Sequence, residues 1–121
     1  MNPVRLFKSF GDALRGLQQA FKTEQNFRIQ VVVGILAIAA AFLLSLHTWE
    51  IILVILLVTL VLTVELLNTA FEYVTDLLKP RLNYHVFLVK DVMAGAVLVT
   101  SVGALIMGVI IFYPHFINIF K

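Results

Sequence analysis

Residues 29–49 read IQVVVGILAIAAAFLLSLHTW, a stretch of 21 residues without Asp, Glu, Lys or Arg. At a rise of about 1.5 Å per residue, a helix of this length spans roughly 30 Å, the thickness of the hydrocarbon core of a bilayer. The stretch begins too late in the chain, and is too long, to be the apolar part of a secretory signal peptide. It therefore predicts a transmembrane helix.

Two further apolar runs follow. Residues 51–64 contain no charged side chain before Glu65, and residues 92–113 contain none before Pro114. Because the middle run of 14 residues is too short to cross a bilayer, its helix must continue through the charged stretch to about residue 78. The sequence thus predicts an all-α integral membrane protein with a single domain. Its predicted parts are an N-terminal interfacial helix and entry at 1–28, transmembrane helices at 29–49, 51–78 and 91–113, and a loop at 79–90.

The overall composition agrees with this class. Hydrophobic residues make up 61% of the chain and charged residues 13%, against about 45–50% and 25% in ordinary soluble proteins. A soluble domain of this size could not bury so much apolar surface, and disordered chains are poor in apolar residues. The net charge of +2 is too small to indicate nucleic-acid binding. Cysteine is absent, and the histidines, His47, His85 and His115, show no spacing typical of a metal site.

The basic residues predict the orientation in the membrane. Five of them precede the first span and three lie in the 79–90 segment, whereas the connection near residues 47–50 has none. Under the positive-inside rule, the side that carries the basic residues is cytoplasmic. We therefore expect a multi-pass protein whose N-terminus and 79–90 loop are cytoplasmic and whose C-terminus is outside.

The N-terminal segment has the pattern of an amphipathic helix. Its apolar residues recur at steps of three and four and fall within an arc of about 80°, while polar residues occupy the other side. The apolar residues are Phe7, Phe10, Leu14, Leu17 and Phe21. Such a helix is expected to lie in the membrane interface, and packing against a soluble partner is the alternative.

Polar residues interrupt the second span on one helical face. They stand at positions i, i+3, i+7 and i+11 and are Glu65, Asn68, Glu72 and Asp76. A carboxylate in the hydrocarbon costs at least about 2.5–3.5 kcal/mol on insertion scales, so three of them on one face indicate a function. The alternative is that they pair with nearby basic residues and fix the packing of helices; these are Arg28, Lys79 and Arg81.

One function that fits the acidic face involves a divalent cation and phosphates. Mg²⁺ prefers oxygen ligands and is often bound by one or two carboxylates together with substrate phosphates. Glu24 and Glu72 can both reach the cytoplasmic interface. Arg5 and Lys90 are available as charge partners of the phosphates. Glu65, deeper and partly desolvated, suits a general base for an alcohol. A proton or cation pathway would suit the same face, and spacing does not separate the two hypotheses.

Several motifs resemble those of the prokaryotic diacylglycerol kinase family, which includes the undecaprenol kinases. Residues 65–76, ELLNTAFEYVTD, resemble the family signature E-x-x-N-[ST]-A-x-E-x-x-x-D. Residues 24–28, EQNFR, look like the E-x-x-F-R entry to its first span. Residues 90–97, KDVMAGAV, look like the K-D-x-x-[AS]-[AG]-A-V start of its third span, and residues 5–17 are similar to its interfacial helix. The resemblance covers nearly the whole chain.

This resemblance implies a homotrimeric lipid kinase of the bacterial cytoplasmic (inner) membrane, with active sites shared between subunits. It implies Mg²⁺- and ATP-dependent phosphorylation of a membrane lipid alcohol, either undecaprenol or diacylglycerol. Glu65 is then the catalytic base, and Asn68 helps to shape the reacting centre. Glu24 and Glu72 hold the metal. The nucleotide site is lined by Arg5, Glu24, Glu72, Asp76, Lys90 and Asp91.

The 79–90 segment departs from the family pattern. Asn83 stands where relatives often have a histidine, and Val89 stands where a small alanine is usual, which bears on nucleotide preference. Ile29, directly after Arg28, is more similar to the undecaprenol kinase branch. Two alternatives remain, a proton- or cation-conducting oligomer and a non-catalytic member of the family.

Overall fold

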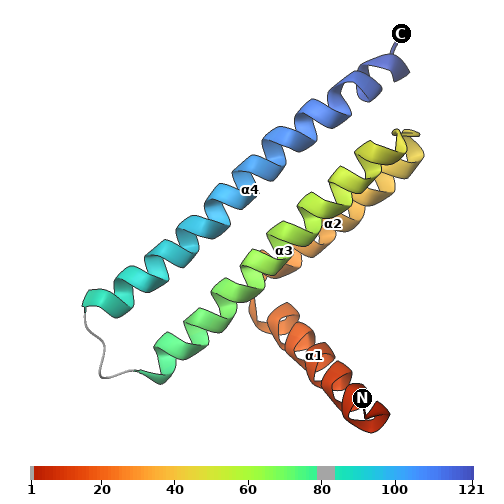
Figure 1. Cartoon of the computed structure of the whole chain (residues 1–121). Coiled ribbons are helices and arrows are strands. Elements are labelled where there is room, and N and C mark those ends of the chain that lie inside the picture. The colour runs from red at the N-terminus through yellow and green to blue at the C-terminus, as the bar shows by residue number, and fades with distance from the viewer. Residues whose placement is uncertain (1, 79–83) are drawn as a thin grey trace.

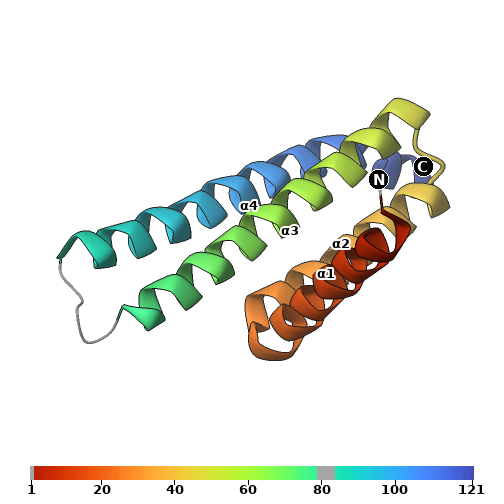
Figure 2. The ribbon, with the colours of Figure 1, turned by 60° about the horizontal axis from the view of Figure 1, so that its bottom comes forward.

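The computed structural model describes residues 2–78 and 84–121, and it is all-helical. Its elements in chain order are α1 (Pro3–Thr23), α2 (Gln25–Leu43), α3 (Thr48–Leu77) and α4 (Tyr84–Ile119). The last three are long and apolar enough to cross a membrane. This confirms the predicted all-α class and the prediction of three apolar helices that are long enough to cross a membrane. Helix α3 lies between α2 and α4, as the views in Figures 1 and 2 both show.

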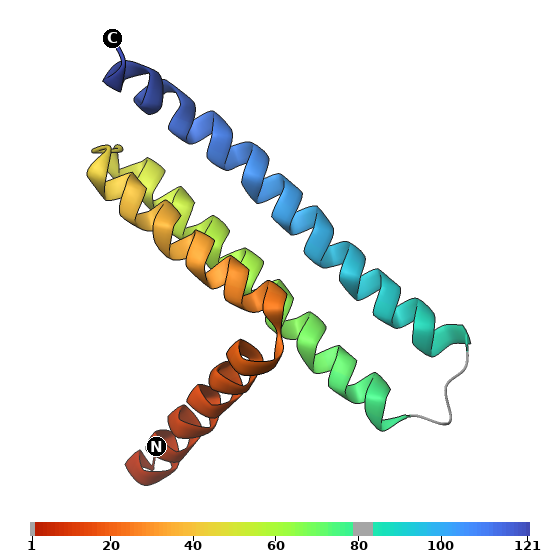
Figure 3. The same ribbon diagram turned by 180° about the vertical axis from the view of Figure 1, so that it is seen from behind.

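Helices α2 and α3 form an antiparallel hairpin (Figure 3). The chain reverses in a short turn at residues 44–47, where Ser45 has a positive φ of 55°. The turn is closed by a hydrogen bond of 3.1 Å from the Leu46 N–H to the Ala41 carbonyl, and both residues are buried. Helix α2 therefore ends at Leu43, six residues before the predicted end of the first span. Hydropathy did not mark this turn because Leu44 and Leu46 continue the apolar run through it and none of its residues is Asp, Glu, Lys or Arg.

The middle of the hairpin depends on close contact between its two helices. Gly34 on α2 faces Val58 on α3, and a Cβ atom at position 34 would come within 2.7 Å of Val58 Cγ1. Small residues let membrane helices approach closely in this way. Nearer the turn, a buried apolar cluster joins all three long helices; its members are Ala41, Leu46, Val54 and Ile111.

Helix α4 extends beyond both predicted ends of the third span. It starts at Tyr84, seven residues before Asp91, and runs through Pro114 to Ile119. We had expected Pro114 to close the span, because proline removes a backbone donor from a helix; membrane helices tolerate proline where neighbouring groups satisfy the freed backbone. Of the predicted 79–90 loop, residues 79–83 lie outside the described part of the chain, and with them Lys79, Arg81 and Asn83.

Helix α1 diverges from the hairpin at Glu24 (Figures 1 and 3). It begins at an N-cap in which the Asn2 side chain accepts a hydrogen bond from the Val4 N–H, with Pro3 in the first turn, where proline is well suited to a helix. It ends where Glu24 takes an extended conformation, with φ −109° and ψ 108°. Within this single chain all five residues of its predicted apolar face are exposed; they are Phe7, Phe10, Leu14, Leu17 and Phe21.

Candidate functional site

The polar face of α3 contains both buried and exposed positions. The Glu65 side chain is the most deeply buried, with 1% of the residue exposed, and Asn68 is also buried at 8%. Glu72 is half-buried, and Asp76, one turn further along the helix, is exposed. Burial therefore decreases from the apolar part of the hairpin towards the C-terminal end of α3.

Glu65 faces α2. Its Oε2 accepts a hydrogen bond of 3.3 Å from the Gln30 Nε2, and the Thr69 hydroxyl donates to the Glu65 backbone carbonyl at 3.0 Å. The carboxylates of Glu24 and Glu72 are close enough to Glu65 to repel its negative charge. The Glu65 carboxylate is thus enclosed, and among the described residues its side-chain hydrogen bond is this single long one from Gln30.

The bend between α1 and α2 positions Glu24. The Arg28 side chain donates from Nη1 to the carbonyl oxygens of Phe21 and Lys22, each at 2.9 Å, and so caps the C-terminal end of α1. The Thr23 hydroxyl lies 3.3 Å from the Tyr73 hydroxyl, which ties the end of α1 to α3. These contacts bring the bend beside the polar face of α3.

As a result, Glu24 lies near Glu72. Burial and the negative charge of Glu72 raise the pKa of the Glu24 carboxyl, and the positive charge of Arg28 only partly opposes them. The Glu72 carboxylate accepts a hydrogen bond of 3.4 Å from the Asn68 amide, which links Glu72 to the buried part of the polar face of α3. We call Glu24, Glu65 and Glu72 the carboxylate cluster.

Two residues of the carboxylate cluster, Glu24 and Glu72, could hold a hard divalent cation. The two carboxylates repel one another, and both lie at the end of the hairpin. They offer only oxygen ligands, as in Mg²⁺ sites that are completed by water and phosphate oxygens. Glu24 and Glu72 are the two that the structure leaves partly accessible. Glu65 is enclosed behind them.

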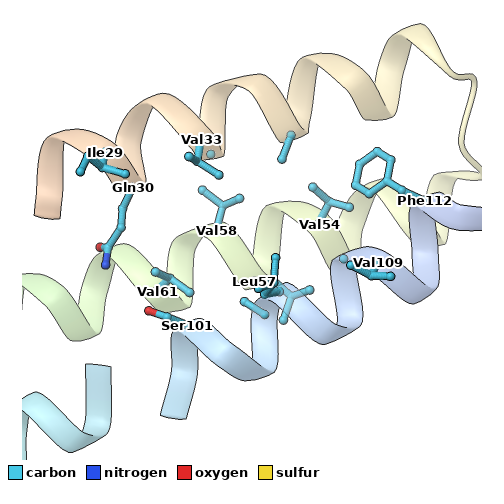
Figure 4. A pocket seen from close by; sticks show the side chains of 15 residues that line it. Ile29, Gln30, Val33, Val54, Leu57, Val58, Val61, Ser101, Val109 and Phe112 are labelled. Carbon is cyan, nitrogen blue, oxygen red and sulfur yellow. The ribbon is translucent and has the colours of Figure 1, made fainter. Parts of the chain in front are cut away.

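An apolar cavity of about 510 Å³ lies between α2, α3 and α4. Figure 4 shows Gln30 and Ser101 together at one end of this cavity and Phe112 at the other. The Gln30 Oε1 and the Ser101 hydroxyl are buried without a hydrogen-bond partner in the described structure. Since buried polar atoms are normally paired, this end of the cavity is suited to a polar group of a ligand. Through its amide nitrogen, Gln30 connects the cavity to Glu65.

Sequence reasoning had missed Gln30 and Ser101. Each is a polar residue inside a predicted apolar span, at 29–49 and 91–113 respectively. That position was the available signal, because polar side chains in a membrane usually face other protein groups or a cavity.

The family model for "Prokaryotic diacylglycerol kinase" matches residues 11–112 of this chain. The chain belongs to the prokaryotic diacylglycerol kinase family. It is 39% identical over 116 residues to a protein named diacylglycerol kinase from Synechocystis sp., covering 94% of this chain and 66% of that relative. It is 36% identical over 110 residues to the undecaprenol kinase of Bacillus subtilis, covering 91% and 89% of the two chains. It is 33% identical over 113 residues to the diacylglycerol kinase of Escherichia coli, covering 93% of each.

These relatives confirm the family that the motifs indicated, and they make the chain a member of a lipid kinase family. The chain spans a little under two thirds of the Synechocystis relative and about nine tenths of the other two.

The remaining predicted site residues of this diacylglycerol kinase family member are spread more widely. Lys90 and Asp91 are exposed in the second turn of α4, at the end of the molecule where α3 finishes (Figure 1). Arg5 is exposed near the start of α1. Because Glu24 comes 19 positions after Arg5, the two lie about 28 Å apart along the helix. A single chain thus brings Glu24, Glu65, Glu72 and Asn68 together, but it does not bring Arg5 to them.

Proposed function

We propose that this protein transfers the γ-phosphoryl group of ATP, with Mg²⁺, to the hydroxyl group of a membrane lipid alcohol. The observation that carries the proposal is the arrangement around Glu65. This buried carboxylate is linked by Gln30 to an apolar cavity, and it interacts electrostatically with the carboxylates of Glu24 and Glu72. In our proposal the lipid hydroxyl reaches Glu65 from the cavity, and the metal-bound phosphate reaches it from the side of Glu24 and Glu72.

In this proposal the lipid enters from the membrane and places its chain in the cavity. The apolar lining accommodates the hydrocarbon, and the unpaired polar atoms of Gln30 and Ser101 orient the hydroxyl end. Burial of the reacting group also excludes water, which would otherwise compete with the lipid as the acceptor of the phosphoryl group.

Glu65 then acts as the general base. It accepts the proton of the lipid hydroxyl while the hydroxyl oxygen attacks the γ-phosphorus of ATP. The bond between that phosphorus and the β–γ bridging oxygen breaks, and ADP leaves with the electron pair. Asn68 supports the reacting centre through its hydrogen bond to Glu72. General-base catalysis of this kind contributes about 10²–10⁴-fold to a rate.

Glu24 and Glu72 would hold the Mg²⁺ ion. When bound, the ion neutralises charge on the phosphate oxygens, which is a main requirement of phosphoryl transfer. Asn68 positions the Glu72 carboxylate through its hydrogen bond. Arg28 positions Glu24 indirectly, because it caps the end of α1 just before Glu24. The raised pKa of Glu24 agrees with this role, because the negative charges of Glu24 and Glu72 repel one another and a bound cation would relieve that repulsion.

The rest of the nucleotide site consists of Arg5, Asp76, Lys90 and Asp91 in our proposal. The length of α1 between Arg5 and Glu24 supports a site that is shared between subunits, because Arg5 would reach the carboxylates of a neighbouring chain more readily than those of its own. A homotrimer of this chain would provide such a neighbour. The exposed apolar residues of α1 suit a position in the membrane interface.

We further propose that the enzyme lies in the bacterial inner membrane with its carboxylate cluster on the cytoplasmic side, where ATP is available. The basic residues before α2 support this orientation. Of the two candidate acceptors we favour undecaprenol over diacylglycerol, because Ile29 follows Arg28 at the entry to the first span.

The experiment that tests the proposal is transfer of radiolabelled phosphate from Mg·ATP in mixed micelles that contain undecaprenol or diacylglycerol. Labelled lipid is expected with at least one acceptor, and the ratio between the two identifies the substrate. If folded protein labels neither lipid, the proposal is wrong. Ion flux in proteoliposomes without ATP would instead indicate a conducting oligomer.

A further inference from the structure

A second cluster of ionisable side chains lies at the other end of the molecule, where the turn at 44–47 joins α2 to α3. It consists of His47, Glu50 and His115, and we call it the histidine–glutamate cluster. It joins the start of α3 to the C-terminal part of α4. These two segments lie at the same end of the molecule in Figure 1. Along α3, Glu50 and Glu65 are 15 residues apart, or about 22 Å, so the two clusters are separate.

Glu50 is the fixed centre of this cluster. It is the third residue of α3, only 7% exposed, and its Oε1 accepts a hydrogen bond of 2.9 Å from the backbone N–H of His47 in a capping box. Two imidazole rings from distant parts of the chain converge on the same oxygen. His47 Nδ1 lies 2.7 Å from Glu50 Oε1, and His115 Nε2 lies 3.0 Å from it.

The cluster has the ligand set of a transition-metal site. Each residue offers one ligand atom, and these atoms all lie within 4.8 Å of one another. Two imidazole nitrogens and one carboxylate oxygen, with water as a fourth ligand, are typical of zinc. Tetrahedral zinc with bonds of 2.0–2.2 Å keeps its ligand atoms about 3.3 Å apart. The two imidazole nitrogens lie 2.7 and 3.0 Å from Glu50 Oε1, so binding of the ion requires small movements of these side chains.

The three side chains of the histidine–glutamate cluster differ in exposure, and this difference leaves a path by which a metal ion can enter. The His115 side chain is 17% exposed and that of Glu50 is 9% exposed, so both are held within the protein. The His47 side chain is 72% exposed, which leaves a path for the ion and for a water ligand. Mg²⁺ is a poor fit because it prefers oxygen ligands.

We propose that His47, Glu50 and His115 bind Zn²⁺, and that the bound ion fastens the C-terminal part of α4 to the turn between α2 and α3. Two of the ligands come from the start of α3 and one from α4, 65 residues later. Binding would therefore stabilise the packing of α4 against the hairpin, because an ion that binds only the folded state favours that state. This site is independent of the proposed phosphoryl transfer.

The test is calorimetric titration of Zn²⁺ into full-length protein in detergent micelles, without a histidine tag. The protein carries Glu24→Gln and Glu72→Gln, which removes binding of zinc to the carboxylate cluster. We expect one Zn²⁺ per chain and a higher thermal midpoint with Zn²⁺ but not with Mg²⁺. In the same background, Co²⁺ should give the visible absorption of a tetrahedral site.

Two substitutions at His115 separate a metal site from a purely hydrogen-bonded cluster. His115→Ala and His115→Gln should each weaken Zn²⁺ binding at least about tenfold, although glutamine can still donate a hydrogen bond to Glu50. His85→Ala is the matched control, because His85 is exposed in the first turn of α4, at the opposite end of that helix, and should leave binding unchanged. The proposal would be overturned if the protein carrying Glu24→Gln and Glu72→Gln did not bind Zn²⁺. It would also be overturned if folded protein with the additional change His115→Gln bound Zn²⁺ equally tightly.

Discussion

Helix α3 carries two buried glutamates, Glu50 at its start and Glu65 15 residues later, and the two have different surroundings. Glu50 is 7% exposed, and one of its oxygens lies within 3.0 Å of a backbone N–H and of two imidazole nitrogens. Glu65 is 1% exposed, and its hydrogen bond from Gln30 is long, at 3.3 Å. Burial alone therefore does not define a role for a carboxylate. Glu50 is held in place by close polar partners, whereas Glu65 has one weak side-chain donor among the described residues, which agrees with the proton-transfer role that we propose for it.

The largest expected effect is that of Glu65→Gln on turnover. Glutamine has nearly the same shape but cannot accept the proton of the lipid hydroxyl, so kcat should fall by about 10²–10⁴-fold. The measurement is kcat in mixed micelles with saturating Mg·ATP and lipid. Asp12→Asn is the control, since Asp12 pairs with Arg15 on the exposed surface of α1 and should not affect activity. Substantial residual activity in Glu65→Gln would mean that another group is the base.

The second prediction concerns Glu24→Gln and Glu72→Gln. Each removes one negative ligand from the proposed magnesium site, so the Mg²⁺ concentration needed for half-maximal activity should rise about tenfold or more. The measurement is a Mg²⁺ titration of phosphoryl transfer for each variant. A curve that coincides with that of the parent protein would exclude the substituted residue from the metal site.

The third prediction concerns Glu50, the other buried glutamate of α3. Glu50→Ala leaves the half-buried His115 ring without this partner and removes the cap of α3, so it should lower the free energy of unfolding by about 1–3 kcal/mol. Glu65→Gln should leave stability unchanged or raise it, because it removes an ionisable group from a buried position and nearly keeps its shape. Both can be measured by denaturation in detergent with EDTA present, which separates this effect from metal binding. Equal stability of Glu50→Ala and the parent protein would show that Glu50 does not hold these helices together.

The smallest expected effect is that of Ser101→Ala on lipid binding. If the Ser101 hydroxyl, which lacks a partner in the cavity, orients the lipid, its loss should raise the KM for the lipid about two- to tenfold, the value of one hydrogen bond. Thr100→Ala is the matched control, because the Thr100 hydroxyl already donates to the Ala96 carbonyl in its own helix. The same KM in both variants would indicate that the lipid does not contact Ser101.

Several features of this protein could be predicted from sequence because they depend on neighbouring residues. Hydropathy over 20 or so residues was enough to predict three apolar helices, and the spacing of Glu65, Asn68 and Glu72 was enough to place them on one face of a helix. The bounds were less predictable. The turn at 44–47 lies within the apolar run and Pro114 lies within α4, so neither hydropathy nor a single proline marks where these helices end.

The sequence by itself thus determined the class of fold, the number of apolar helices and the acidic face of α3, since all of these follow from composition and helical periodicity. Only the tertiary structure brought Glu24 beside Glu72, formed the cavity between Gln30 and Phe112, and joined His47 to His115 through Glu50. The histidines had shown no metal-site spacing along the chain. Their convergence depends on the antiparallel return of α4 along α3, a contact between residues 65 positions apart that no local pattern encodes.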